Sequence, residues 1–181
     1  MNRSLILRIG YGLLAVAVVT ADLVTKARII ERFPVGRGVE VIPGFFSLTH
    51  VRNSGIIFGI ASSLGPETTR VILSAAGILL LLFLSFYSLR NPPRDFALQI
   101  GIHLIMGGAV GNIADRVRYG SVTDFLDFYI RTSHRYFHWW TFNLADTAIM
   151  TGVILLLLHA LLSPPAERGD SAESLPPRKG V

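Results

Sequence analysis

The sequence predicts a membrane-spanning, all-α protein built around four transmembrane helices. Of its 181 residues, 51% are hydrophobic and only 16% are charged, which is too apolar for an ordinary soluble domain of this length. A bilayer core of about 30 Å requires roughly 20 helical residues per span, and four apolar stretches are long enough. Their approximate ranges are 9–29, 70–90, 95–115 and 142–162.

The first span has a second interpretation. Arg3 and Arg8 precede an apolar run, and the small residues at 19–21 resemble the cleavage site of a secretory signal peptide. Three further spans follow, however, and the helical pattern continues through Asp22 and Lys26. A transmembrane helix is therefore the favoured interpretation.

The basic residues flank the apolar runs and form no stripe, so the net charge of +5 indicates membrane topology and not nucleic-acid binding. Four spans place both termini on one side. That side carries seven Lys and Arg residues against ten on the other, yet Arg3, Arg8 and the short "RNPPRD" loop favour cytoplasmic termini. The basic excess on the opposite side then calls for a functional explanation. The absence of cysteine excludes disulfides, thiol catalysis and thiolate metal sites.

The connections differ in character. Between the first two spans, "VEVI" and "FFSLTHV" flank Pro43 and Gly44, which predicts a small sheet within about 38–60. Residues 164–181 have the composition of a disordered tail, which the topology places in the cytoplasm. Residues 1–163 are thus predicted to form a single transmembrane domain.

Polar residues gather at the predicted span ends opposite the termini. Because antiparallel spans alternate in direction, these ends share one level. Asp146 lies just inside this boundary, since the apolar helix that follows it covers roughly 25 Å. The residues concerned are Asp22, Lys26, Asn53, Gly55, Asn112, Asp115, Arg116, Asp124, Asp127, Asn143 and Asp146.

Several of these residues also have a purely structural interpretation. Asp22 and Lys26 have the spacing and order of an intrahelical ion pair. The dipeptide Asp115-Arg116 is typical of a helix end, and Asp127 is typical of a solvated face. None of these interpretations explains why so many polar groups share one level.

The start of the fourth span has a structural interpretation of its own. Asn143 suits an N-cap, which puts Asp146 in the first helical turn, where free amides and the helix dipole stabilise a carboxylate. On the third span, Gly107 and Gly111 have the small-xxx-small spacing of close helix packing.

The functional interpretation pairs Asp146 with a second carboxylate, either Asp124 or Asp115, and spacing alone does not choose between them. Two neighbouring aspartates share one proton because both cannot easily ionise. The ionised partner can take a proton from water while the protonated partner donates to a carbonyl oxygen. Such a pair hydrolyses a peptide bond without serine, cysteine or metal. The histidines lack a metal-ligand spacing, so no metal or cofactor is expected.

Four stretches together resemble the lipoprotein signal peptidases (signal peptidase II), which are aspartic endopeptidases of the bacterial inner membrane: "DLVTKA", "RNSGIIFGI", "GGAVGNIADRVRYGSVTDFLDF" and "FNLADTAI". The resemblance implies that Asp124 and Asp146 form the catalytic pair. It also implies a set of substrate-binding or supporting residues: Asp22, Lys26, Asn53, Gly55, Asn112, Asp115, Arg116 and Asn143.

The same resemblance implies the architecture and the substrate. It adds a periplasmic β-cradle at about 38–60 and a periplasmic amphipathic helix at about 124–138 to the four spans, with both termini cytoplasmic. The implied substrate is a prolipoprotein whose cysteine carries a diacylglyceryl group, cleaved immediately before that cysteine. The expected partners are this substrate and membrane lipid, with no nucleic acid, and the chain is expected to be a monomer.

Two other classes of protein compete with this hypothesis. A small proton-coupled transporter or proton channel also uses intramembrane carboxylates, but it predicts polar residues through the full depth of the bundle. A structural or assembly subunit held together by the Gly107 and Gly111 face gives no reason for paired aspartates flanked by asparagines. Cleavage of a lipidated precursor peptide separates all three.

Overall fold

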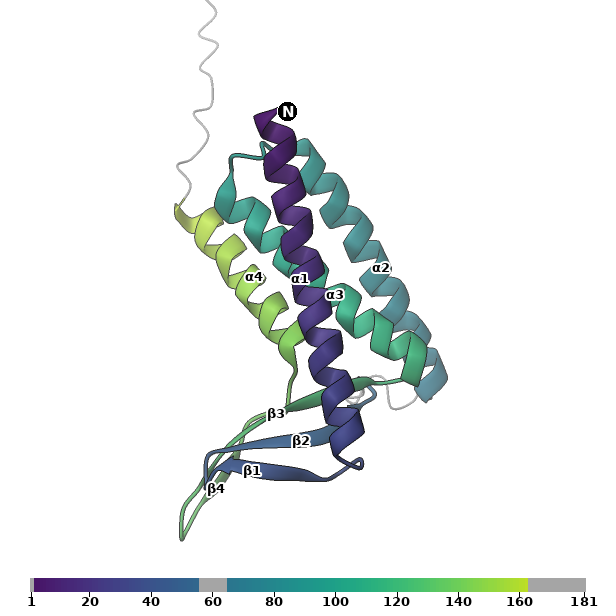
Figure 1. Ribbon diagram of the computed structural model, residues 1–181, viewed down its shortest axis with the longest axis vertical. Helices are drawn as coiled ribbons and strands as arrows, with labels where there is room; N and C mark the ends of the chain where they lie inside the picture. Colours follow the sequence, from purple (N-terminus) through teal and green to yellow (C-terminus); the bar gives the residue numbers. More distant parts are fainter. Residues whose placement is uncertain (1, 56–64, 163–181) are drawn as a thin grey trace, which may run out of the picture.

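Four long helices and one small antiparallel sheet make up the protein (Figure 1). The computed structural model describes residues 2–55 and 65–162. The helices are α1 (Arg3–Arg32), α2 (Pro66–Arg90), α3 (Phe96–Tyr119) and α4 (Leu144–Leu162). The strands are β1 (Gly38–Ile42), β2 (Phe46–Asn53), β3 (Val122–Arg131) and β4 (Tyr136–His138). Within the described ranges, all four helices are long and apolar enough to cross a membrane, as predicted.

Helix α3 lies at the centre of the bundle. In its most apolar window 56% of the residues are buried, against 6% to 17% in the other helices, whose outer faces are left for lipid. Glycines allow the close approach that α3 needs. A Cβ on Gly107 would lie 2.8 Å from the Val18 Cβ of α1, and one on Gly108 would lie 2.4 Å from the Ala145 carbonyl oxygen of α4. The small-residue spacing of α3 therefore serves helix packing, as predicted.

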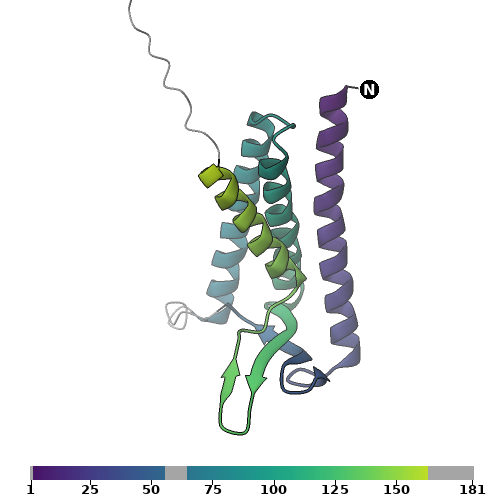
Figure 2. The ribbon, with the colours of Figure 1, turned by 90° about the vertical axis from the view of Figure 1, so that its left-hand side faces the viewer.

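The first residues of α1 and the last residues of α4 lie at one end of the bundle, and the sheet lies at the other (Figures 1 and 2). At the end with the termini, the α2–α3 turn is tied to α1. The Arg8 guanidinium donates to the Ser88 carbonyl oxygen at 3.1 Å, and the Tyr11 hydroxyl donates to the Pro93 carbonyl oxygen at 2.8 Å. The first bond reaches a carbonyl group in the last turn of α2, where intrahelical donors run out, and the second reaches a carbonyl group of the α2–α3 turn itself.

The sheet has the strand order β1-β2-β3-β4, and all neighbours are antiparallel. Gly120 ends α3 in the left-handed conformation, with φ at 76°, and turns the chain directly into β3. The register pairs Asn53 with Val122 and Val51 with Asp124. An isolated bridge between Leu126 and Phe142 then leads the chain into α4. The sheet thereby brings the end of β2 and the start of β3 beneath the start of α4.

The predicted periplasmic helix at 124–138 is wrong, because this segment forms the β-hairpin of β3 and β4. The stretch "VTDFLDFYIR" is rich in β-branched and aromatic residues, which favour strands. Strand β2 also offers an edge on which this segment pairs from its first residues. Of the predicted β-cradle at 38–60, β1 and β2 cover 38–53, while residues 56–60 and the predicted tail at 164–181 lie outside the described residues.

Candidate active site

The site begins at the first turn of α4, where Asn143 and Asp146 bind each other reciprocally. The Asp146 backbone N–H donates to the Asn143 Oδ1 at 2.9 Å, and the Asn143 backbone N–H donates to the Asp146 Oδ2 at 3.3 Å. This is the geometry of a capping box, which satisfies two backbone donors at a helix start. The predicted N-cap role of Asn143 is confirmed, and it fixes Asp146 in the first helical turn.

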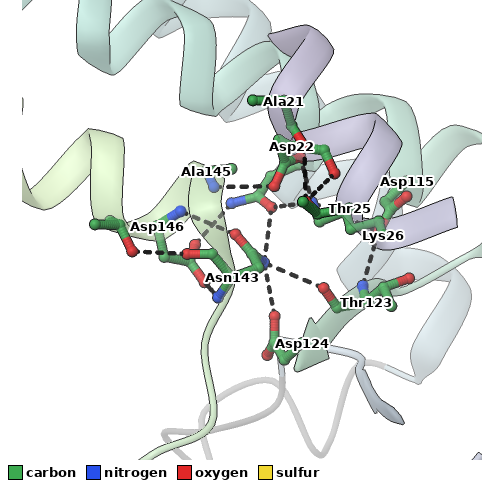
Figure 3. A network of polar contacts seen from close by, with 12 residues as sticks. Ala21, Asp22, Thr25, Lys26, Asp115, Thr123, Asp124, Asn143, Ala145 and Asp146 are labelled. Atoms are coloured by element: carbon green, nitrogen blue, oxygen red, sulfur yellow. Dashed lines mark hydrogen bonds and ion pairs between the residues drawn. The ribbon is translucent and has the colours of Figure 1, made fainter. Parts of the chain in front are cut away.

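The Asp124 carboxylate lies on β3 and receives two amide donors. Asn53, at the end of β2, donates its Nδ2 to the Asp124 Oδ2 at 2.8 Å. Asn143 donates its Nδ2 to the Asp124 Oδ1 at 2.7 Å (Figure 3). Asn143 therefore contacts both aspartates, one through its side-chain NH2 and the other through its backbone. Gly55 donates its N–H to the Asn53 Oδ1 at 2.9 Å, which holds that amide in place.

Asp115, the other candidate partner from the sequence, is engaged elsewhere. Its Oδ2 accepts the Thr123 backbone N–H at 2.7 Å and lies 3.6 Å from the Lys26 Nζ. Asp115 thus anchors the start of β3, one residue before Asp124. Of the two candidates, Asp124 is the one that shares Asn143 with Asp146.

Lys26 lies at the centre of the buried polar network and is only 1% exposed. Its Nζ lies 2.7 Å from the Asp22 Oδ2 and donates to the Asn112 Oδ1 at 3.0 Å. An ammonium group can only donate, so this contact requires the amide oxygen of Asn112 on the Lys26 side. The Asn112 Nδ2 is then left for the Asp146 Oδ1, to which it donates at 2.8 Å.

Asp22, on α1, forms a hydrogen bond to the first turn of α4. Its Oδ1 accepts the Ala145 backbone N–H at 2.9 Å, so α1 satisfies a free amide in the first turn of α4. Gly111 makes room for this carboxylate, since a Cβ there would lie 2.4 Å from the Asp22 Oδ2. The predicted ion pair of Asp22 with Lys26 is confirmed, and it is fully buried.

Arg116 lies within electrostatic range of Asp115, Asp124 and Asp146, and it forms no hydrogen bond or ion pair to another described side chain. The sequence-based reasoning missed Thr123, which is completely buried and accepts a hydrogen bond from the Arg52 Nη1 at 2.9 Å. No pattern in the sequence marks Thr123, because residues 122–125 do not alternate and the structure buries all four of them.

Burial dominates the electrostatics of Asp124, which is 1% exposed, and raises its pKa to about 6. The hydrogen bond from Asn53 lowers this pKa, the nearby Asp146 carboxylate raises it, and the hydrogen bond from Asn143 lowers it again. The two aspartates therefore differ in environment. Asp124 is enclosed, whereas Asp146 is half-buried at a helix start.

Asp146 opens on a cavity of about 330 Å³ between α4 and the β4–α4 connection. Aromatic and apolar groups dominate its lining, which comprises Trp139, Trp140, Phe142, Thr147, Met150 and Thr151 besides Asp146. Such a cavity combines an apolar wall with one ionisable group, as ligand sites commonly do. Among the described residues, no group of three or more His, Cys, Asp or Glu side chains has the arrangement of a metal site.

The fold and the site together define a multi-pass membrane protein whose buried carboxylates and amides meet where the spanning helices give way to the sheet. Comparison with known proteins is more specific. A family model described as signal peptidase (SPase) II matches residues 14–162. The chain therefore belongs to the signal peptidase II family, whose members are peptidases.

Individual relatives agree with this assignment. The chain is 38% identical over 166 residues to a lipoprotein signal peptidase of Syntrophus aciditrophicus, covering 89% of this chain and 96% of the relative. It is 41% identical over 151 residues to one of Symbiobacterium thermophilum, covering 82% and 92%. A solved bacterial membrane enzyme, determined by the in meso method at 1.9 Å resolution, superposes with a TM-score of 0.71 at 35% identity and covers 86% of this chain and 94% of that one.

Proposed function

We propose that this protein is an aspartic endopeptidase that cleaves the signal peptide from diacylglyceryl-modified prolipoproteins, immediately before the lipidated cysteine. Asp124 and Asp146 are the catalytic pair in this proposal. The observation that carries it is the bridging contact of Asn143, which donates to the Asp124 Oδ1 at 2.7 Å through its side chain and to the Asp146 Oδ2 at 3.3 Å through its backbone. Family membership supports the substrate class.

The environments of the two carboxylates support a division of roles. Burial favours the protonated form of Asp124, which suits it to act as the acid. Asp146 accepts hydrogen bonds from the Asn112 Nδ2 and the Asn143 backbone N–H and opens on the cavity, so it is the group that we assign as the base. Asp146 then takes a proton from water as the water oxygen attacks the scissile carbonyl carbon. Asp124 donates its proton to the carbonyl oxygen, and a tetrahedral diol forms.

Collapse of the diol reverses both transfers. Asp146 gives its proton to the amide nitrogen, the C–N bond breaks, and Asp124 recovers a proton from the diol. The products are a peptide carboxyl group and the free amine of the lipidated cysteine. The pair returns to its starting state with one water consumed.

The arrangement of the chain supports a substrate held in the bilayer. The polar network lies at the sheet end of the helices, and Asp146 opens on a cavity that extends along α4 to Met150 and Thr151. A peptide anchored by its own acyl chains approaches such a cavity laterally. We therefore place the sheet and the site at the periplasmic face of the bacterial inner membrane, with both termini cytoplasmic and the protein acting as a monomer.

The test is cleavage of a diacylglyceryl-modified precursor peptide by purified protein, with an unlipidated peptide beside it. Asp124→Asn and Asp146→Asn are each expected to abolish cleavage while the protein remains folded in detergent. Asp127→Asn is the matched control, because Asp127 lies on the same strand but accepts from the Thr141 hydroxyl and pairs with His138. It should keep cleavage within a fewfold of the unaltered protein.

Near-normal processing by either of the first two variants would overturn the catalytic assignment. Equal cleavage of the lipidated and unlipidated peptides would overturn the substrate class and leave the pair intact. The two parts of the proposal therefore fail separately.

A further inference from the structure

The β3–β4 hairpin, taken here together with Trp139 and Trp140 directly after β4, exposes a concentration of aromatic side chains outside the four spans. Every residue from 131 to 140 is exposed. Tyr136, Phe137, Trp139 and Trp140 are between 56% and 67% exposed, and Ile130 is 54% exposed. With roughly 200 Å² for each aromatic side chain, the four leave on the order of 500 Å² uncovered. Soluble proteins seldom leave such a patch in water.

The hairpin also carries cationic groups beside these rings. Arg131 and Arg135 are exposed near its turn, as is His134. The Arg131 Nη2 lies 2.6 Å from the Glu40 Oε1, whereas Arg135 and His134 pair with no acidic side chain among the described residues. Exposed aromatic rings with neighbouring basic groups match the interfacial layer of a bilayer, where ring edges and cations meet phosphate and glycerol oxygens.

The position of the hairpin fits the same environment. The sheet lies across the end of the bundle, and the hairpin lies beneath α4 (Figures 1 and 2). Its aromatic surface is continuous with the outer face of α4, because Trp139 and Trp140 line one cavity together with Met150, which is 62% exposed on α4. The Trp139 backbone N–H donates to the Phe128 carbonyl oxygen at 2.9 Å, which fixes the main chain at this point of the connection.

We propose that the β3–β4 hairpin is seated in the phospholipid headgroup layer, with Trp139 and Trp140 in contact with lipid. The hairpin is then a fifth membrane contact, beside the four helices. It forms the lipid-side wall of the cavity on which Asp146 opens. This inference rests on the membrane-spanning fold and not on the proposed peptidase reaction.

The chain offers a direct probe, since Trp139 and Trp140 are its only two tryptophans. Trp139→Phe and Trp140→Phe each leave a single indole and keep an aromatic ring. The full chain would be placed in nanodiscs of phosphatidylcholine and phosphatidylglycerol, with and without acyl chains brominated near the glycerol. In both variants, brominated lipid is expected to reduce emission at least twofold, while aqueous iodide has little effect.

A positive control places an indole on a surface that must face lipid. Leu157→Trp, in a chain that also carries both Phe substitutions, puts it on α4 at a position that is 58% exposed. If brominated lipid quenches this control but neither native tryptophan, and iodide quenches both native ones, the proposal is wrong. Quenching of only one native indole by lipid also overturns it, because the assignment requires both. None of these readings depends on cleavage, so failure here is distinguishable from failure of the proposed function.

Discussion

Replacing Lys26 with methionine tests whether its ammonium group stabilises the fold by compensating the buried Asp22 carboxylate. The substitution keeps the unbranched apolar stem and removes the ammonium group, which is 1% exposed. That group faces the Asp22 Oδ2 at 2.7 Å and the Asp115 Oδ2 at 3.6 Å. Among the described residues, the Lys26 ammonium group is the one polar partner of the Asp22 Oδ2. Lys26→Met therefore leaves a buried carboxylate oxygen without a partner.

Breaking a buried ion pair by removing one partner typically costs about 3–5 kcal/mol, because the remaining charge is neither solvated nor paired. Lys26→Met is expected to lower the free energy of unfolding by that amount. Adding Asp22→Asn should restore about 2 kcal/mol of the lost stability, because the asparagine side chain is neutral. Its amide oxygen can still accept the Ala145 N–H, which lies 2.9 Å from the Asp22 Oδ1 in the unaltered protein. The double variant is thus expected to be more stable than the single one.

The assay is reversible unfolding in mixed micelles by added denaturing detergent, followed by circular dichroism. Arg28→Met is the matched control on the same helix, because its pair with Glu31 is exposed on both sides, at 78% and 73%, and such pairs contribute little. If Lys26→Met costs no more than Arg28→Met, the ion pair does not support the fold. If Asp22→Asn deepens the loss, the unpaired-charge argument is wrong.

The sequence was sufficient for the features that depend on local pattern. Apolar length predicts the spans, and depth counting with N-cap chemistry places Asp146 in the first turn of α4 next to Asn143. The spacing of Asp22 and Lys26 predicts their ion pair, because residues four apart share one helix face. Each of these predictions requires knowledge of a single element only.

Contacts between different helices and strands could not be predicted from local sequence patterns. The choice of Asp124 over Asp115 depends on the β2–β3 register, which sets Val51 opposite Asp124 and so brings Asn53 to its carboxylate. Three contacts of the network use the backbone N–H groups of Thr123, Ala145 and Asn143. Because every residue except proline carries a backbone N–H, the residue types in the sequence do not reveal such contacts. The hairpin at 122–138 was missed because pairing with β2 decides its conformation.

The remaining predictions concern the pH dependence of cleavage and the packing of the glycines on α1 and α3. Cleavage should fall as pH rises through the pKa of Asp124, about 6, because the pair then loses its shared proton. Asn53→Ala removes a hydrogen bond that favours the ionised carboxylate, so it should raise that pKa and move the alkaline limb of kcat/KM to higher pH; a limb that stays or moves down contradicts the assignment. Gly111→Ala would put a Cβ 2.4 Å from the Asp22 Oδ2, and overpacking of this kind costs about 1–3 kcal/mol. Gly12→Ala on α1 meets nothing within 4 Å and should instead gain up to about 1 kcal/mol from helix propensity. Opposite shifts in the free energy of unfolding, measured in the same micelles, are therefore expected, and equal shifts would mean that the Asp22 carboxylate does not need the space beside α3.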